Sequence, residues 1–178
     1  MSAPVIITLY DPLWVTQYNE EAARIQLEIG EWLAGLEHVG STAVPGLAAK
    51  PVIDILAGLR TLADAPHCIP RLQGLGYRYI PDYELDLPER RYFQKLIDGQ
   101  HSHHIHMVEV TSDFWRRHLL FRDYLRSHPD DARAYGELKL RLAEQFENDR
   151  AAYTDAKGTF INEVMAKAEV WAKQKRAE

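Results

Sequence analysis

Cysteine is nearly absent from this sequence, which holds Cys68 as its one residue of that type. A single cysteine excludes an intramolecular disulfide framework and is typical of a reducing compartment. The chain also lacks any apolar run approaching the ~20 residues that cross a bilayer. Its first residues, MSAPVIITLYDP, have neither the basic start nor the apolar stretch of a signal peptide. We therefore expect a cytoplasmic protein with no membrane partner.

An excess of positive charge is missing as well. Lysine and arginine number 21 against 26 aspartate and glutamate residues, so the formal net charge is −5. Because proteins that bind nucleic-acid polymers present a strongly basic surface, we expect no such partner. The GxGxxG fingerprint and the Walker loop are absent from the sequence too, which excludes dinucleotide-binding and P-loop proteins at the level of motifs.

Strand signals gather in the first part of the chain. Residues 51–59 (PVIDILAGL) form an almost wholly apolar run, typical of a central strand covered on both faces. Asp98-Gly99 is a hairpin turn signal between strand patterns at 91–97 and 105–110. Shorter strands are expected at 36–40 and 77–80.

Helical periodicity dominates elsewhere. Asp11-Pro12 is a helix entry, and apolar residues follow at helical spacing as far as Trp32 and Leu33. A weaker helix is expected over 62–75, and three helices follow residue 111, the last from about Asp149. The pattern predicts one α+β domain over 1–178, with a sheet-containing core in 1–110 and a helical part in 111–178.

The most informative stretch runs from His38 to Leu59 (HVGSTAVPGLAAKPVIDILAGL). Gly40 allows close backbone approach, and Ser41 and Thr42 offer hydroxyl and N–H donors to an anion. Asp54 lies in an apolar strand, where a carboxylate is costly to bury unless it is paired, metal-bound or at a site opening. Alone, each feature also fits an ordinary loop or a buried acid bonded to backbone. Their combination indicates a site.

This stretch resembles the signature of the GrpB family, a member of the nucleotidyltransferase-fold superfamily. The segments YDPLW, RRYFQK, HHIHMVE, LLFRDYLRSHP and AYTDAKGTFI extend the resemblance over most of the chain. It implies a nucleotidyltransferase-like mixed sheet flanked by helices, in which Gly40-Ser41 opens a helix that cradles a phosphate. It implies less about activity, because members are mostly uncharacterised. A similar domain occurs fused to dephospho-CoA kinase.

The sequence departs from the superfamily at one position. Active nucleotidyltransferases carry two acids at i and i+2 on the second strand, because two-metal phosphoryl chemistry needs several carboxylates around the ions. Here Asp54 stands alone, and Leu56 occupies the position of the second acid. Either another residue supplies the missing ligand, or the site has changed chemistry, or it only binds.

Two histidines are candidates for the missing metal ligand. His104 and His106 alternate with Ile105 and so share one face of a strand, where they can hold a metal ion together with Asp54. We expect Mg²⁺ or Mn²⁺, with Zn²⁺ as an alternative. Glu109 falls on the opposite face. His38 shares a face with Gly40 and fits either the site or the core.

Basic residues supply candidate phosphate ligands. In a hairpin, Arg91 and Lys95 share a face with Phe93, as an anion clamp requires, although they would equally balance nearby surface acids. Lys50 precedes the strand of Asp54, and the family pattern adds Lys157.

We predict a protein that binds a nucleotide or another phosphorylated small molecule with a divalent metal, with nucleotidyl transfer as the reaction that the fold allows. Gly40, Ser41 and Thr42 would hold the phosphate, Asp54 the metal, and Arg91 the developing charge. One alternative is a non-catalytic binding or regulatory module with a degenerate site. Another is a metal-dependent enzyme built on Asp54, His104 and His106.

Overall fold

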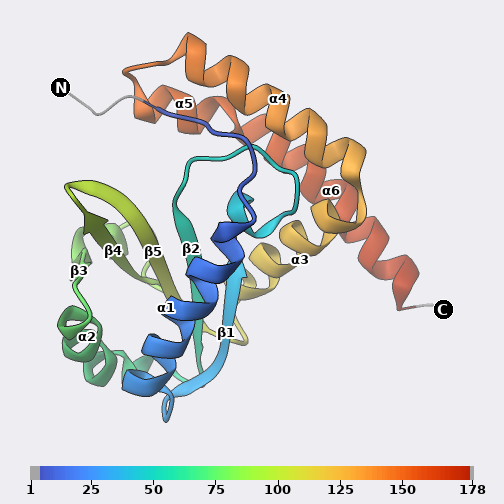
Figure 1. Cartoon of the computed structure of the whole chain (residues 1–178). Helices are drawn as coiled ribbons and strands as arrows, with labels where there is room; N and C mark the ends of the chain where they lie inside the picture. The colour runs from blue at the N-terminus through green and yellow to red at the C-terminus, as the bar shows by residue number, and fades with distance from the viewer. Residues whose placement is uncertain (1–4, 177–178) are drawn as a thin grey trace.

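A five-stranded mixed sheet forms the centre of the molecule in the computed structural model, which describes residues 5–176 (Figure 1). The strands lie in the order β1-β2-β5-β4-β3. Their bounds are Leu33–Val39 for β1, Ile53–Leu59 for β2, Tyr77–Tyr79 for β3, Arg91–Ile97 for β4 and Gln100–Glu109 for β5. β2 and β5 pair in parallel, and the other neighbouring strands are antiparallel.

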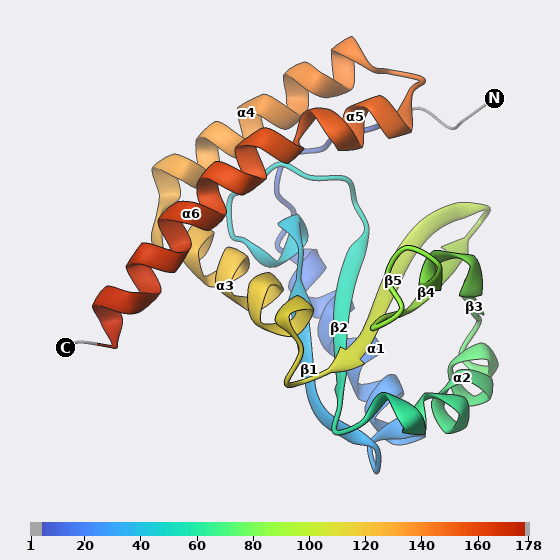
Figure 2. The same ribbon diagram turned by 180° about the vertical axis from the view of Figure 1, so that it is seen from behind.

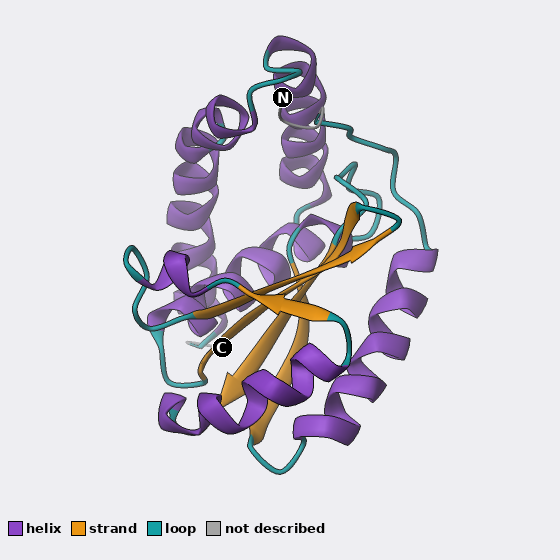
Figure 3. Ribbon diagram, turned by 90° about the vertical axis from the view of Figure 1, so that its left-hand side faces the viewer, coloured by secondary structure: helices purple, strands orange, loops and turns teal. Residues whose placement is uncertain are grey.

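Helices cover both faces of this sheet (Figure 3). α1 and α2 pack on one face, around buried residues such as Ile55, Phe93 and Ile105. α3 packs on the other, and α4, α5 and α6 extend beyond one end of the sheet (Figure 2). The bounds are Leu13–Ile29 for α1, Ala65–Gly74 for α2, Asp113–Ser127 for α3, Pro129–Gln145 for α4, Arg150–Ala156 for α5 and Gly158–Lys175 for α6.

The α+β plan with a helical C-terminal part is confirmed. The hairpin turn is also where the sequence placed it, since Asp98 and Gly99 both have positive φ, at 51° and 76°. The backbone N–H of Leu13 bonds to the Asp11 carboxylate at 2.9 Å, which accounts for the start of α1. Among residues 5–176, no helix has the length and apolar character needed to span a bilayer.

Three element boundaries differ from the prediction. α1 ends at Ile29, so Trp32 lies outside the helix and Leu33 begins β1. β5 begins at Gln100 rather than 105, because the two-residue turn lets its histidines pair with β4. The predicted last helix is two helices that meet at Lys157.

Candidate functional site

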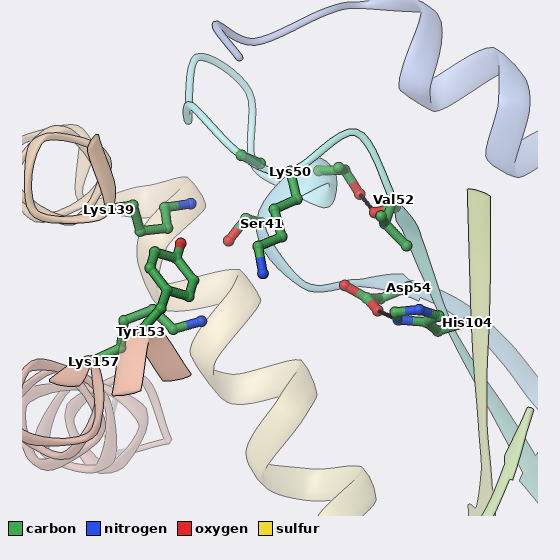
Figure 4. A pocket seen from close by; sticks show the side chains of 10 residues that line it. Ser41, Lys50, Val52, Asp54, His104, Lys139, Tyr153 and Lys157 are labelled. Atoms are coloured by element: carbon green, nitrogen blue, oxygen red, sulfur yellow. Dashed lines mark hydrogen bonds and ion pairs between the residues drawn. The ribbon is translucent and has the colours of Figure 1, made fainter. Parts of the chain in front are cut away.

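A cavity of about 130 Å³ lies between the sheet and the C-terminal helices (Figure 4). Two groups of residues line it. The sheet side contributes Ser41, Thr42, Ala49, Lys50, Val52, Asp54 and His104, and the helices contribute Lys139, Tyr153 and Lys157. The predicted meeting of Ser41 and Asp54 in one cleft is therefore present, with His104 beside them.

His104 and His106 both approach the carboxylate of Asp54. Asp54 and His104 are direct partners in the β2/β5 pairing, and Nδ1 of His104 lies 3.2 Å from Oδ1 of Asp54. Nε2 of His106 lies 3.8 Å from the same oxygen. The shared face that strand alternation predicts is thus confirmed, whereas the metal-binding role remains a prediction.

Further hydrogen bonds orient the two imidazoles. Nε2 of His104 lies 3.2 Å from Nδ1 of His101, and Nδ1 of His106 lies 3.4 Å from NH1 of Arg90. Because the guanidinium only donates, the Nδ1 of His106 accepts, which leaves its Nε2–H directed at Asp54. Each imidazole thus has one nitrogen toward the acid and one toward another polar group.

Asp54 is an ionised acid in this setting. Burial raises the pKa of its carboxyl, but hydrogen bonds from His104 and His106, together with their charges, lower that pKa more. The net pKa lies below the ordinary value, so Asp54 is charged at neutral pH. Burial in turn lowers the pKa of His106, against the opposing influence of Asp54. The result is a carboxylate whose Oδ1 faces both imidazoles.

The backbone at Gly40 passes close to the side chain of Asp54. Its φ of 72° is left-handed, and a Cβ there would lie 2.5 Å from Oδ2 of Asp54. Glycine is therefore needed to fit the backbone against the acid. The helix expected to open at Gly40-Ser41 is a single 3₁₀ turn, Ser41–Ala43, which leads into extended backbone at Val44, and its phosphate-binding role remains a prediction.

Thr42 and His38 form part of the structural frame. Nε2 of His38 lies 3.0 Å from Oγ1 of Thr42, whose hydroxyl also donates to the carbonyl of Val52 at 3.3 Å. The His38 ring stacks on Tyr18 of α1, so it lies on the face away from Asp54. Burial lowers the pKa of His38 to about 4. Of the two roles open to His38, the structure shows the core one, and the Thr42 hydroxyl is engaged with it.

Three lysines surround the cavity. The Nζ atoms of Lys50 and Lys157 lie 4.5 Å and 4.4 Å from the ring centroid of Tyr153. Nζ of Lys139 is buried 4.5 Å from the ring centroid of Tyr135 and has no hydrogen-bond partner among residues 5–176. Burial, then the charge of Lys157, lowers the pKa of Lys139 to about 7. Lys50 and Lys157 thus line the cavity, and their phosphate-binding role remains a prediction.

Arg91 and Lys95 do not reach this cavity, so the predicted clamp does not form beside Ser41 and Asp54. Both project with Phe93 toward the face that α1 and α2 cover. NH1 of Arg91 pairs with Glu84 at 3.0 Å, and Nζ of Lys95 pairs with Glu21 at 2.8 Å. These ion pairs match the alternative of charge balance.

Neither the position of the missing second acid, Leu56, nor the carboxylate of Glu109 contributes to the cavity. Leu56 is 0% exposed and packs with Val39 and Val108 against the aromatic residues of α3. The carboxylate of Glu109 accepts a hydrogen bond from the N–H of Leu62 at 2.8 Å, away from the cavity. Within residues 5–176, no three His, Cys, Asp or Glu side chains are arranged to hold a metal.

Sequence reasoning missed Lys139 and Tyr153. The signal for Lys139 lay in the buried stripe of α4, where Tyr135, Lys139 and Leu142 follow one another at helical spacing. A lysine inside an apolar stripe is rare enough to indicate a function. Tyr153 gave no such signal, because an aromatic residue at that position fits an ordinary core.

These features define an α+β protein with a lysine-lined cavity at one end of a mixed sheet. Residues 4–167 match the family model described as GrpB protein. The chain is 34% identical over 165 residues to the glutamate-rich protein GrpB of Alkalihalophilus pseudofirmus, which covers 90% of this chain and 94% of that protein. The chain belongs to the GrpB family, as the motifs predicted.

Other relatives extend this comparison. The crystal structure of the conserved protein GrpB from Enterococcus faecalis is similar with a TM-score of 0.85 and 36% identity, covering 93% of this chain and 99% of that one. The UPF0157 protein YqkA of Bacillus subtilis is 37% identical over 169 residues, which are 95% of this chain but 48% of YqkA. This chain therefore spans about half of that relative. A dephospho-CoA kinase of Mycolicibacterium paratuberculosis is 29% identical over 192 residues, covering 96% of this chain and 47% of that protein.

Proposed function

We propose that this chain binds a phosphorylated small molecule in the cavity beside Asp54. The observation that carries the proposal is the charge around the cavity, where three lysines stand against a single carboxylate. That carboxylate already accepts one hydrogen bond from His104 and lies close to His106. Lysine amines are point-like donors suited to phosphate oxygens. The Ser41 hydroxyl adds a neutral donor at the same place.

A nucleotide is the ligand class we favour within this proposal. The resemblance to the nucleotidyltransferase fold supports it, and so does the similarity to proteins named dephospho-CoA kinase. A divalent metal, Mg²⁺ or Mn²⁺ first and Zn²⁺ second, would be held by Asp54 with His104 and His106. In that case the metal would supply charge stabilisation at the phosphate, and the histidines would have to turn from the acid toward the ion.

Binding without catalysis is the second candidate, and Leu56 favours it. The strand position of the second acid lies in an apolar cluster under α3, so two-metal chemistry lacks one side of its ligand set. We expect nucleotidyl transfer to be weak or absent. A labelled-nucleotide transfer assay checks this, and turnover that depends on both Asp54 and His104 would instead favour a metal-dependent enzyme.

Calorimetry and thermal melting with inorganic phosphate, AMP and ATP test the binding proposal. Lys157→Met removes a cavity cation, whereas Arg91→Met removes a cation from the other face and serves as the matched control. We expect wild type and Arg91→Met to bind alike and Lys157→Met to bind roughly tenfold more weakly. Equal binding by both variants, or loss in Arg91→Met alone, would contradict the proposed site.

A further inference from the structure

Lys139 is the buried group of the cavity that its own surroundings do not satisfy. Lys139 is 2% exposed, its Nζ has no hydrogen-bond partner in the part of the chain that the structure describes, and its side chain points into the cavity from α4 (Figure 4). Buried polar atoms in native proteins are almost always bonded, and an exception calls for an explanation such as a missing ligand. An amine offers three donors, so the missing group is an acceptor.

The charged and polar groups facing Lys139 come from several elements. Lys157, between α5 and α6, opposes its charge, and Asp54 on β2 favours it. The other groups around the cavity are uncharged or cationic: Tyr135 on its own helix, Ser41 in the 3₁₀ turn, Tyr153 on α5 and Lys50 before β2. Because Asp54 is engaged by His104, no carboxylate of the cavity pairs with the amine.

We propose that Lys139 makes the cavity select a dianionic terminal phosphate, a phosphate monoester rather than a diester, by taking up a proton as that phosphate enters. The inference rests on the proposed function, since an anion must occupy the cavity for Lys139 to receive its charge. To the proposed function it adds the class of phosphate that binds and the way in which the cavity distinguishes a monoester from a diester.

The protonation state of Lys139 before an anion binds supports this step. With its pKa lowered to about 7, Lys139 is largely neutral at slightly alkaline pH. A dianion placed beside it stabilises the ammonium form, so the amine gains a proton from solvent and no covalent bond changes. A diester carries one negative charge and two terminal oxygens, whereas a monoester carries a second charge and a third oxygen for the third lysine.

Methyl phosphate and dimethyl phosphate are the probes that separate these cases. Titration calorimetry at about pH 8, where methyl phosphate is mostly dianionic, is run in two buffers of different ionisation enthalpy to count the protons taken up. Wild type is compared with Lys139→Met and with Lys139→Gln, which guards against a packing artefact. Lys173→Met removes an exposed lysine of α6 and is the matched control.

Wild type and Lys173→Met should bind methyl phosphate about tenfold or more tightly than dimethyl phosphate, with uptake of about 0.8 proton per ligand. Both Lys139 variants should lose the uptake and most of the preference. Tight binding of methyl phosphate without proton uptake, or uptake that persists in both variants, would overturn the inference while leaving the proposed function intact. Failure of wild type to bind either ester, inorganic phosphate or nucleotides would overturn the proposed function and the inference together.

Discussion

Nδ1 of His104 lies 3.2 Å from Oδ1 of Asp54, and the two residues face each other across the parallel pairing of β2 and β5. A direct pair in a sheet has little freedom, because both backbones are fixed by the ladder. The backbone of Gly40 passes close to the other oxygen of the same carboxylate, since a Cβ at Gly40 would lie 2.5 Å from Oδ2. The acid is therefore held in place from two sides before any ligand arrives, and its ionisation is coupled to folding.

Asp54→Asn tests that coupling. The lowered pKa of Asp54 means that its charged form stabilises the fold above the unfolded-state pKa of about 3.9, and this contribution is lost as pH falls through the folded pKa. We expect Asp54→Asn to lower the free energy of unfolding by about 1–2 kcal/mol near neutral pH. The difference should shrink below about pH 4. Urea denaturation against pH measures it, with exposed Asp82→Asn as control. A difference that is constant with pH would contradict the assigned ionisation.

Metal addition gives a second test of the same residue. If Asp54, His104 and His106 hold a divalent ion, Mn²⁺ should raise the melting temperature of wild type by several degrees through binding to the native state. Asp54→Asn should lose that shift, whereas His67→Gln, which alters a histidine stacked on Trp32, should keep it. Equal shifts in wild type and Asp54→Asn would place the metal elsewhere.

Gly40→Ala tests the close approach to Asp54. A methyl group at Gly40 meets Oδ2 of Asp54 and also strains a backbone with φ of 72°. Gly46 has a φ of 78° but no atom within 4 Å of its ideal Cβ, so Gly46→Ala isolates the backbone effect. We expect Gly46→Ala to cost about 1 kcal/mol and Gly40→Ala about 1–3 kcal/mol more, by chemical denaturation. Similar losses in both variants would show that the acid moves aside freely.

Strand periodicity together with the family resemblance predicted the grouping of Asp54 with the histidines. An alternation of two fixes that His104 and His106 share a face of their strand, and the resemblance pointed to Asp54 as the acid that they accompany. The lysine side could not be predicted this way. The buried stripe of α4 marks Lys139 as unusual, but Lys139 meets the cavity only because α4 packs against residues 47 and 48, which no local pattern predicts.

The predicted clamp of Arg91 and Lys95 is absent from the cavity for a similar reason, because a tertiary contact decides where these side chains lie. The shared face of these residues is what the hairpin pattern predicts, but the pattern does not tell which of the two faces α1 and α2 will cover. Lys95 pairs with Glu21 of α1, which is 74 residues away in the sequence. This ion pair holds Lys95 on the face that α1 covers. Gly40 was recognised as a place of close approach, and the side chain that its backbone approaches is that of Asp54.

Lys139 also makes stability depend on pH in the absence of ligand. Its folded pKa of about 7 lies below the unfolded value of about 10.4, so the unfolded chain binds more protons between these values. Stability should therefore rise as pH increases from about 7 to 10, by up to a few kcal/mol. Lys139→Met should remove this rise and stabilise the protein near pH 7, whereas Lys173→Met should not. Melting curves recorded across this pH range test the prediction. If stability rises with pH as steeply in Lys139→Met as in wild type, the lowered pKa of Lys139 is contradicted.

Leu56→Asp tests how much a second acid at this position would lower the free energy of unfolding. Leu56 is 0% exposed among Val39, Val108 and the aromatic residues of α3, so a carboxylate there loses hydration without gaining a donor. We expect the free energy of unfolding to fall by more than about 3 kcal/mol, whereas Leu85→Asp, at a leucine that is 89% exposed, should change it by less than about 0.5 kcal/mol. Because Asp54 and Leu56 share a face, the new acid should also strengthen the melting-temperature shift caused by Mn²⁺. A variant as stable as Leu85→Asp would show that the apolar cluster opens readily. Unchanged metal response in a folded Leu56→Asp variant would show that a second acid alone does not create the two-metal site.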